Sequence, residues 1–281
     1  RSKRKILWRI MKLSVTSWSF PQCSLKECIG ISKLLSINAI DIGYFYKSSI
    51  DKKKLLEDHK NIINKLNRYE IDYSNLYHLF GNSLADRNLA IKDSLEQNSK
   101  DLEIVSKFCK ELNIGSIFIL PGIINKDQSR KDAFENSSYS LKKLRDVCLK
   151  NNIELLFEPH VHSFLESPEH TLELINATDG MKIVLDYAHF TCLGWTQYQT
   201  DLLIQYAGHI HLRQAKSGFL QTKLEEGTIN FQAILGKLKE IKYKNYLSIE
   251  YVHQDYMNTL YEDVLSETIK MRDLINNWKG K

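Results

Sequence analysis

Eight apolar runs of strand length recur along the chain, and longer stretches with helical periodicity separate them. The apolar runs span residues 12–18, 39–44, 71–78, 116–120, 154–158, 182–186, 209–212 and 246–250. Four of the intervening helices are placed at residues 102–112, 139–150, 230–241 and 263–278. Strands that alternate with helices indicate βα units and a parallel sheet. We therefore predict an α/β fold, either a closed (β/α)8 barrel or an open doubly wound sheet.

The length of 281 residues fits one closed barrel, a fold that typically takes roughly 250 residues. No linker rich in Pro, Gly or Ser divides the sequence, and its composition does not change abruptly. We predict a single domain over residues 12–281 and interpret residues 1–11 as an N-terminal extension or expression remnant. A signal peptide is the rival interpretation, but no apolar stretch of the necessary length follows the basic residues.

The net charge of +5 is weak evidence for a nucleic-acid partner, because five basic residues lie within the first ten positions. No segment approaches the ~20 apolar residues of a membrane span. The five cysteines are scattered and form no CxxC pair, which is typical of free thiols in a reducing compartment. We therefore predict a cytoplasmic protein that binds neither nucleic acid nor membrane. The sequence leaves a homo-oligomer open.

Four successive predicted strands end in, or carry near their end, a residue able to bind metal or move protons. These residues are Glu158, Asp186, His211 and Glu250. An acid buried at a strand end needs a partner, and one metal ion serves several acids at once. A single such acid is more often a helix N-cap or a solvated loop residue, but four of them favour a metal site. Because strand ends converge at the mouth of a barrel, they also favour the closed barrel.

Three carboxylates and one imidazole form an oxygen-rich set of ligands. Such a set suits Mn²⁺, Mg²⁺ or Co²⁺ better than a structural Zn²⁺, although Zn²⁺ is possible. His209 lies on the same face of its strand as His211, and we interpret His209 as a group inside the barrel. The sequence therefore predicts one divalent metal ion as cofactor.

Motifs in the second half of the chain resemble those of the xylose isomerase-like barrel superfamily. They are Phe-Glu-Pro-His at 157–160, Leu-Asp-Tyr-Ala-His at 185–189, His-Ile-His-Leu-Arg at 209–213, Glu-Gly-Thr-Ile-Asn-Phe at 226–231 and Ile-Glu-Tyr at 249–251. The resemblance runs from about residue 12 to residue 275 and implies a single xylose isomerase-like TIM barrel of the sugar phosphate isomerase/epimerase family. It places Glu158, Asp186, His211 and Glu250 at metal-ligand positions. It places His189 where relatives contact substrate or a second metal.

Two departures from the superfamily motifs limit which of its members this chain resembles. Leu120 stands before Pro121-Gly122, where endonuclease IV has a histidine ligand, and residues 219–221 lack the Asp-x-His pair of that enzyme. We therefore do not expect a three-metal DNA-repair phosphodiesterase. Gln214 stands where many relatives carry an acid, and this leaves the subfamily open.

Several residues near the predicted mouth are candidates for substrate binding. They are His189, Arg213, Lys216, His78, Trp18 and Tyr44. Arg213 and Lys216 follow the seventh strand, where many barrels bind phosphate, but a solvated surface pair is the competing interpretation. His78 either lines the pocket or hydrogen-bonds backbone. Trp18 and Tyr44 either stack against a sugar or belong to the core.

These features predict proton transfer at a carbon next to a carbonyl, through an enediolate that the metal stabilises. Glu158 and Glu250 are the predicted catalytic acid and base, while Asp186 and His211 mainly hold the metal. The expected activity is that of a metal-dependent sugar or sugar phosphate isomerase or epimerase, with a small carbohydrate or sugar acid as substrate. A dehydratase of the inosose or dehydroshikimate type and a non-catalytic sugar-binding barrel stay open.

Overall fold

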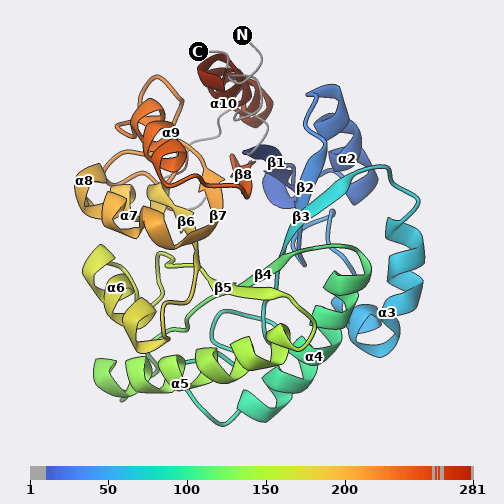
Figure 1. Cartoon of the computed structure of the whole chain (residues 1–281), viewed down its shortest axis with the longest axis vertical. Coiled ribbons are helices and arrows are strands. Elements are labelled where there is room, and N and C mark those ends of the chain that lie inside the picture. The colour runs from blue at the N-terminus through green and yellow to red at the C-terminus, as the bar shows by residue number, and fades with distance from the viewer. Residues whose placement is uncertain (1–10, 255–256, 258, 260–262, 280–281) are drawn as a thin grey trace.

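The computed structural model describes residues 11–254, 257, 259 and 263–279, and within them eight parallel strands form a closed barrel surrounded by helices (Figure 1). Consecutive strands are hydrogen-bonded neighbours, and β8 closes the barrel against β1. The strands are β1 (Lys12–Thr16), β2 (Ala39–Ile42), β3 (Asp72–Tyr77), β4 (Ser116–Ile119), β5 (Glu154–Phe157), β6 (Ile183–Asp186), β7 (Ala207–Leu212) and β8 (Tyr246–Ile249). The predicted (β/α)8 barrel is confirmed.

The helices follow the strands in the expected alternation. They are α2 (Leu25–Leu34), α3 (Lys52–Leu66), α4 (Leu95–Glu111), α5 (Arg130–Leu149), α6 (Pro168–Ala177), α7 (Tyr187–Cys192), α8 (Gln197–Thr200), α9 (Phe231–Glu240) and α10 (Val264–Lys279), with 3-10 helices η1 (Ser17–Ser19) and η2 (Asp201–Tyr206). Helices α4 and α5 begin at residues 95 and 130 rather than at the predicted 102 and 139. Their first turns are mostly polar, so apolar periodicity does not reveal them. Instead, the Ser129 side chain caps α5 by accepting a hydrogen bond from Asp132 N (3.0 Å).

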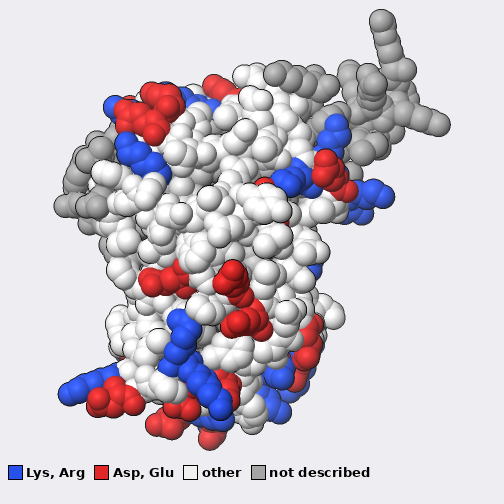
Figure 2. Space-filling view, turned by 90° about the vertical axis from the view of Figure 1, so that its left-hand side faces the viewer, with Lys and Arg blue, Asp and Glu red and all other residues white. Residues whose placement is uncertain are grey.

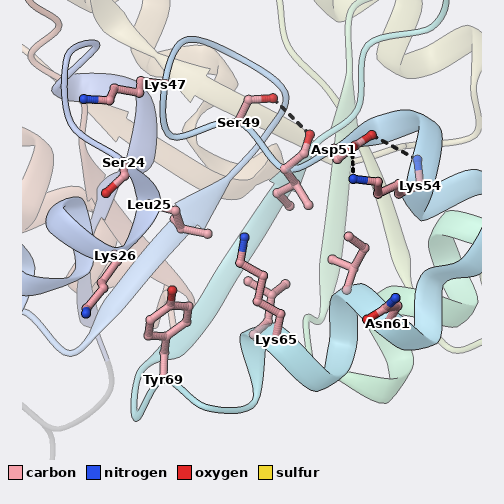
Figure 3. Close-up of a pocket in the computed structure, with 13 residues that line it drawn as sticks. Ser24, Leu25, Lys26, Lys47, Ser49, Asp51, Lys54, Asn61, Lys65 and Tyr69 are labelled. Carbon is pink, nitrogen blue, oxygen red and sulfur yellow. Dashed lines mark hydrogen bonds and ion pairs between the residues drawn. The ribbon is translucent and has the colours of Figure 1, made fainter.

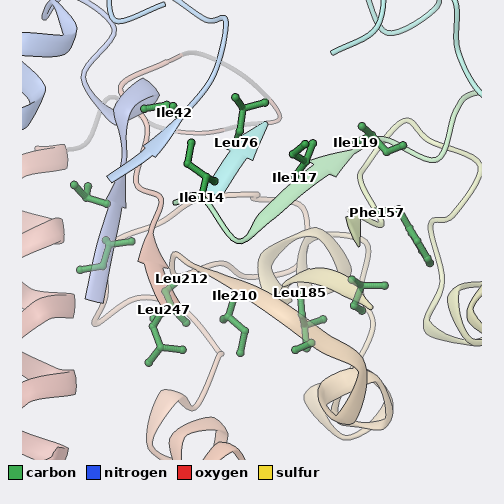
Figure 4. Close-up of a cluster of buried hydrophobic side chains, with 14 of the residues drawn as sticks. Ile42, Leu76, Ile114, Ile117, Ile119, Phe157, Leu185, Ile210, Leu212 and Leu247 are labelled. Atoms are coloured by element: carbon green, nitrogen blue, oxygen red, sulfur yellow. The ribbon is translucent and has the colours of Figure 1, made fainter. Parts of the chain in front are cut away.

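Alternation along the strands divides the apolar core into two layers. Outward-facing residues such as Ile117, Leu185 and Ile210 are fully buried in the main hydrophobic cluster (Figure 4). Residues at the alternate positions, among them Phe118 and Val184, belong to a second, smaller cluster inside the barrel. Polar side chains at these inward-facing strand positions can therefore reach the barrel mouth.

Among the described residues, no helix is both long enough and apolar enough to cross a membrane. Figure 2 shows acidic and basic side chains interspersed on one face of the molecule. Residues 1–10 of the predicted extension lie outside the described residues. Met11, the last residue of that predicted extension, is 9% exposed and packs in the main core.

Candidate metal centre and substrate cavity

Three of the four predicted metal ligands converge inside the barrel mouth. Glu158 directly follows β5, His211 lies on β7, and Glu250 directly follows β8. His211 Nδ1 lies 3.1 Å from Glu158 Oε1 and 3.1 Å from Glu250 Oε2, and all three residues are buried. Since the three strands contribute inward-facing positions, the closed barrel brings together residues up to 92 positions apart, from Glu158 to Glu250.

The donor geometry fits a divalent ion. Adjacent ligands of an octahedral ion, each about 2.1 Å from the metal, lie about 3 Å apart, close to the separations found here. Glu250 Oε2 is also buried without a well-formed hydrogen bond from any described residue, although His211 Nδ1 is near. A buried, under-satisfied carboxylate oxygen is costly, and a bound cation would remove that cost. Glu158, His211 and Glu250 are therefore well placed to hold a metal.

Asp186, the fourth predicted ligand, has other partners in this structure. Its Oδ1 accepts a hydrogen bond from Ala188 N (2.8 Å) and so caps α7. Its Oδ2 accepts from Arg213 Nε (2.9 Å), and Arg213 Nη2 lies 2.7 Å from the same oxygen. Arg213 Nη2 also lies 3.6 Å from Glu250 Oε2. The guanidinium therefore stands between Asp186 and the converging residues.

A buried carboxylate that the sequence analysis did not single out lies behind His211. Asp41, on β2, accepts hydrogen bonds through Oδ2 from Nε2 of His209 (2.8 Å) and Nε2 of His211 (3.2 Å). The hydroxyl of Ser74 donates to its Oδ1. The His209 and His211 rings are perpendicular, with centroids 5.3 Å apart. Asp41 thus occupies one side of the His211 ring, while the other side faces Glu158 and Glu250.

The two converging carboxylates have different electrostatic environments. Burial raises the pKa of Glu158 to about 7, against the opposing effect of its hydrogen bond with His211. Burial acts on Glu250 too, but the neighbouring positive charges of His211 and Arg213 outweigh it and lower the pKa to about 2. Burial also opposes a charge on His211, yet Glu250, Asp41 and Glu158 raise its pKa well above the usual value. Glu158 is thus the carboxylate with a pKa closer to neutral pH.

A cavity of about 300 Å³ opens beside the candidate metal centre. Its aromatic wall consists of Trp18, Phe45 and Tyr77, whose ring centroids lie between 4.7 and 6.2 Å apart. The other lining residues are Tyr46, Leu84, His160, Arg213, Leu220, Glu250, Val252 and Gln254. The size and the proximity of Glu250 identify this cavity as the candidate substrate site.

Trp18 connects the cavity wall to the metal centre. Its Nε1 donates a hydrogen bond to Glu250 Oε1 at 2.6 Å, and its ring packs edge-on against His211 with centroids 6.1 Å apart. From the sequence, Trp18 is predicted either to stack against a sugar or to belong to the core. In the structure it is 6% exposed, joins the inner apolar cluster and also lines the cavity.

The other predicted substrate-binding residues lie at different distances from this cavity. His189 is buried at the mouth, where its Nε2 is 3.2 Å from Arg213 Nη2 and 3.6 Å from Asp186 Oδ2. Lys216 lies over the Phe219 ring, with Nζ 5.0 Å from the centroid. Tyr44 OH and His78 Nδ1 are hydrogen-bonded at 3.1 Å. None of these four lines the cavity as the described residues define it.

The cavity wall also contains residues that the sequence analysis missed. Phe45, Tyr46 and Tyr77 were not singled out, although Phe45 and Tyr77 each adjoin a predicted candidate in sequence and Tyr46 lies two positions after Tyr44. Tyr46 OH donates to Gln254 Oε1 at 2.6 Å and links the loop after β2 to the loop after β8. Which of two adjacent aromatic residues faces the mouth depends on strand register, and the pairing of β2 with β3 contains an irregularity after Ile40.

A larger hollow of about 500 Å³ lies outside the barrel between α2 and α3 (Figure 3). Four lysines line it, and its acid, Asp51, already caps α3 and pairs with Lys54 at 3.2 Å. None of the candidate catalytic or metal-binding residues contributes to it. Its position on the outer surface separates it from the chemistry at the barrel mouth.

The fold and the acidic and histidine residues at its mouth define a (β/α)8 barrel with a candidate metal centre at the C-terminal ends of the barrel strands. Residues 37–272 match the family model described as xylose isomerase-like TIM barrel, and the chain belongs to this family. The resemblance that the sequence motifs indicated is therefore confirmed.

The individual relatives share low sequence identity with this chain. Over 171 residues the chain is 26% identical to 2-oxo-tetronate isomerase of Haemophilus influenzae, covering 58% of this chain and 65% of that protein. A solved structure of L-ribulose 3-epimerase superposes with a TM-score of 0.73 at 16% identity, covering 96% of this chain and 95% of the other. The IOLI protein with a bound zinc atom gives a TM-score of 0.70 at 19% identity, covering 95% and 99%. These two structures establish the shared fold.

Proposed function

We propose that this chain is a metal-dependent sugar or sugar-acid isomerase or epimerase. The observation that carries the proposal is the convergence of Glu158, His211 and Glu250 beside a cavity large enough for a monosaccharide. The similarity to 2-oxo-tetronate isomerase and to the L-ribulose 3-epimerase structure supports the same class of reaction. The zinc bound in the similar IOLI protein supports a divalent metal as cofactor.

The chemistry is proton transfer at the carbon next to a carbonyl. Glu158, His211 and Glu250 would hold the ion, with Asp186 as a fourth ligand whose carboxylate is shared between the ion and Arg213. A bound divalent ion supplies positive charge that stabilises the negative oxygen formed when the proton leaves. We assign the proton transfers to Glu158 and Glu250, which follow β5 and β8, two strands that β6 and β7 separate around the barrel.

The two carboxylates account for both reaction outcomes. One carboxylate removes the proton from carbon, and the C–H electron pair moves toward the carbonyl to give the enediol form. Return of a proton to the opposite face of the same carbon gives the epimer. Return to the former carbonyl carbon, with a proton moved from the adjacent hydroxyl to the former carbonyl oxygen, gives the isomer. Trp18 fixes Glu250 through its 2.6 Å hydrogen bond. We assign to His189, whose Nε2 lies 3.2 Å from Arg213 Nη2, the orientation of a substrate hydroxyl through that arginine.

A dehydratase on the same scaffold is the second candidate. It shares the removal of the proton next to the carbonyl and differs only in the loss of a hydroxyl group, so the same residues would serve it. The two are separated by their products, since dehydration gives an ultraviolet-absorbing enone and isomerisation does not.

The test is product analysis by NMR with a panel of ketoses and keto sugar acids and added Mn²⁺. We expect Glu158→Gln and Glu250→Gln each to lower turnover by about 10²–10⁴-fold, because each removes a proton-transfer group. Glu154→Gln is the matched control, since Glu154 lies on the same strand as Glu158 but at its exposed N-terminal end. Wild-type turnover in either Glu158→Gln or Glu250→Gln would refute the assignment.

A further inference from the structure

We infer that the substrate is an uncharged sugar that carries no phosphate and presents a C–H face to the aromatic wall of the cavity. This inference rests on the proposed function, because it specifies the substrate of the same site. It is drawn from the charges and the chemistry of the cavity lining.

The first observation concerns the positive charges. Among the described residues that line the cavity, Arg213 is the sole lysine or arginine. Arg213 is 4% exposed, and two nitrogens of its guanidinium lie 2.7 and 2.9 Å from Asp186 Oδ2. One of those nitrogens is also 3.6 Å from Glu250 Oε2. A guanidinium with two carboxylate partners is already compensated, so it is poorly suited to bind a phosphate.

The loops after β7 and β8, which bind phosphate in many barrels, offer no replacement. Lys216 lies over the Phe219 ring, and Lys223 lies 3.5 Å from Glu226. Neither lines the cavity. After β8, the sequence contains no lysine or arginine from residue 251 to residue 263.

The second observation is the balance of formal charge at the mouth. The buried carboxylates of Asp41, Glu158, Asp186 and Glu250 amount to four formal negative charges. Arg213 and one divalent ion would supply three positive charges, so no excess positive charge is left for an anionic substrate. A neutral substrate preserves this balance, whereas a phosphorylated substrate adds up to two negative charges in a buried, low-dielectric site.

The third observation is the chemistry of the wall. Trp18, Phe45 and Tyr77 present aromatic surface, and Leu84, Leu220 and Val252 add aliphatic surface. Such a wall suits the C–H face of a sugar and gives a phosphate no hydrogen-bond donor in exchange for its hydration. The polar groups that remain on the lining, such as the Tyr46–Gln254 pair, suit hydroxyl groups.

The test measures binding of unreactive analogues to the Mn²⁺-loaded chain by calorimetry. Ribitol is compared with ribitol 5-phosphate, and mannitol with mannitol 1-phosphate, so that each pair differs only in the phosphate. We expect the uncharged member to bind at least about tenfold more tightly in at least one pair. Tighter binding of the phosphorylated members overturns the inference, and so does binding of neither member of either pair.

A matched pair of variants tests the charge argument itself. Leu84 lines the cavity and is 37% exposed, so that a polar side chain is tolerated there. Leu84→Lys adds a cation and should reduce the ratio by which the uncharged analogue binds more tightly than the phosphorylated one. Leu84→Gln should leave this ratio unchanged. An equal effect of the two variants would contradict the role of charge. If the uncharged analogue binds but no member of the ketose panel is turned over, the proposed reaction fails while the inference on the ligand stands.

Discussion

Replacing Asp41 by asparagine should weaken metal binding without removing any residue that faces the metal. Asp41 Oδ2 accepts hydrogen bonds from Nε2 of both His209 (2.8 Å) and His211 (3.2 Å). When a metal replaces the proton on Nδ1, an Nε2–H donated to Asp41 would keep the Nδ1 lone pair of His211 directed toward the ion between Glu158 and Glu250. Asparagine keeps the shape of the side chain, but it loses the negative charge and one of the two acceptor oxygens.

The expected size of the effect follows from the contacts that are lost. Substitution of a carboxylate that orients a metal-binding histidine typically lowers metal affinity about 10–100-fold. Hydrogen bonds that involve a charged group contribute about 1.5–3 kcal/mol each. Converted to a change in affinity, this free energy covers a similar range. Because Asp41 is fully buried, the free energy of unfolding of the metal-free chain should also fall, by about 2–4 kcal/mol.

The assay is competition for Mn²⁺ or Zn²⁺ with a fluorescent chelator, together with two-dimensional NMR of the histidine ring nitrogens. Asp41→Asn should raise the dissociation constant of the metal at least tenfold and change the protonation pattern of the His211 ring. Asp72→Asn, an exposed aspartate at the start of β3, is the control and should change neither. If Asp41→Asn folds and binds metal as tightly as the wild type, the positioning role of Asp41 is wrong.

Three further results are expected. Trp18→Phe keeps the aromatic wall but removes the donor to Glu250, so kcat/KM should fall about 10–100-fold; unchanged kinetics would count against this contact. Burial, reinforced by the positive charges of Lys52 and Arg87, lowers the pKa of His78 to about 3. Below pH 6.5 the unfolded chain therefore binds a proton at His78 that the native state does not bind. Relative to His78→Gln, the wild type should therefore lose about 2 kcal/mol of stability from pH 7 to pH 5 in denaturant titrations, with His170→Gln as the control that keeps this loss. Phe108→Ala should lower the free energy of unfolding by about 3–5 kcal/mol, since Phe108 is fully buried.

Strand positions were predictable because most strands, such as β4 (Ser-Ile-Phe-Ile) and β8 (Tyr-Leu-Ser-Ile), are short and mainly apolar runs bounded by polar residues. The predicted runs 154–158 and 246–250 differ from β5 and β8 only by including Glu158 and Glu250, which lie just beyond the strands. The acids at the strand ends were predictable for the same reason. Their convergence in space followed from the barrel once the number of strands was correct.

Asp41 shows what the sequence could not resolve. It lies in the run Ala-Ile-Asp-Ile, where a charged residue within buried positions was itself a signal that partners must exist. Those partners, His209 and His211, are 168 and 170 positions away, and one sequence does not show which histidine a buried acid contacts. The pairing of Asp186 with Arg213 was hidden similarly, because it depends on side-chain direction at adjacent strand ends.

The measurement that tests the central claim most directly is incorporation of solvent deuterium into a ketose panel as Mn²⁺ is titrated into the metal-free chain. We predict exchange at a carbon next to the carbonyl that rises with metal and saturates at about one equivalent. Exchange should be lost in Glu158→Gln and in Glu250→Gln. Exchange that persists in excess chelator would contradict the account, as would its absence across the panel when the metal is bound.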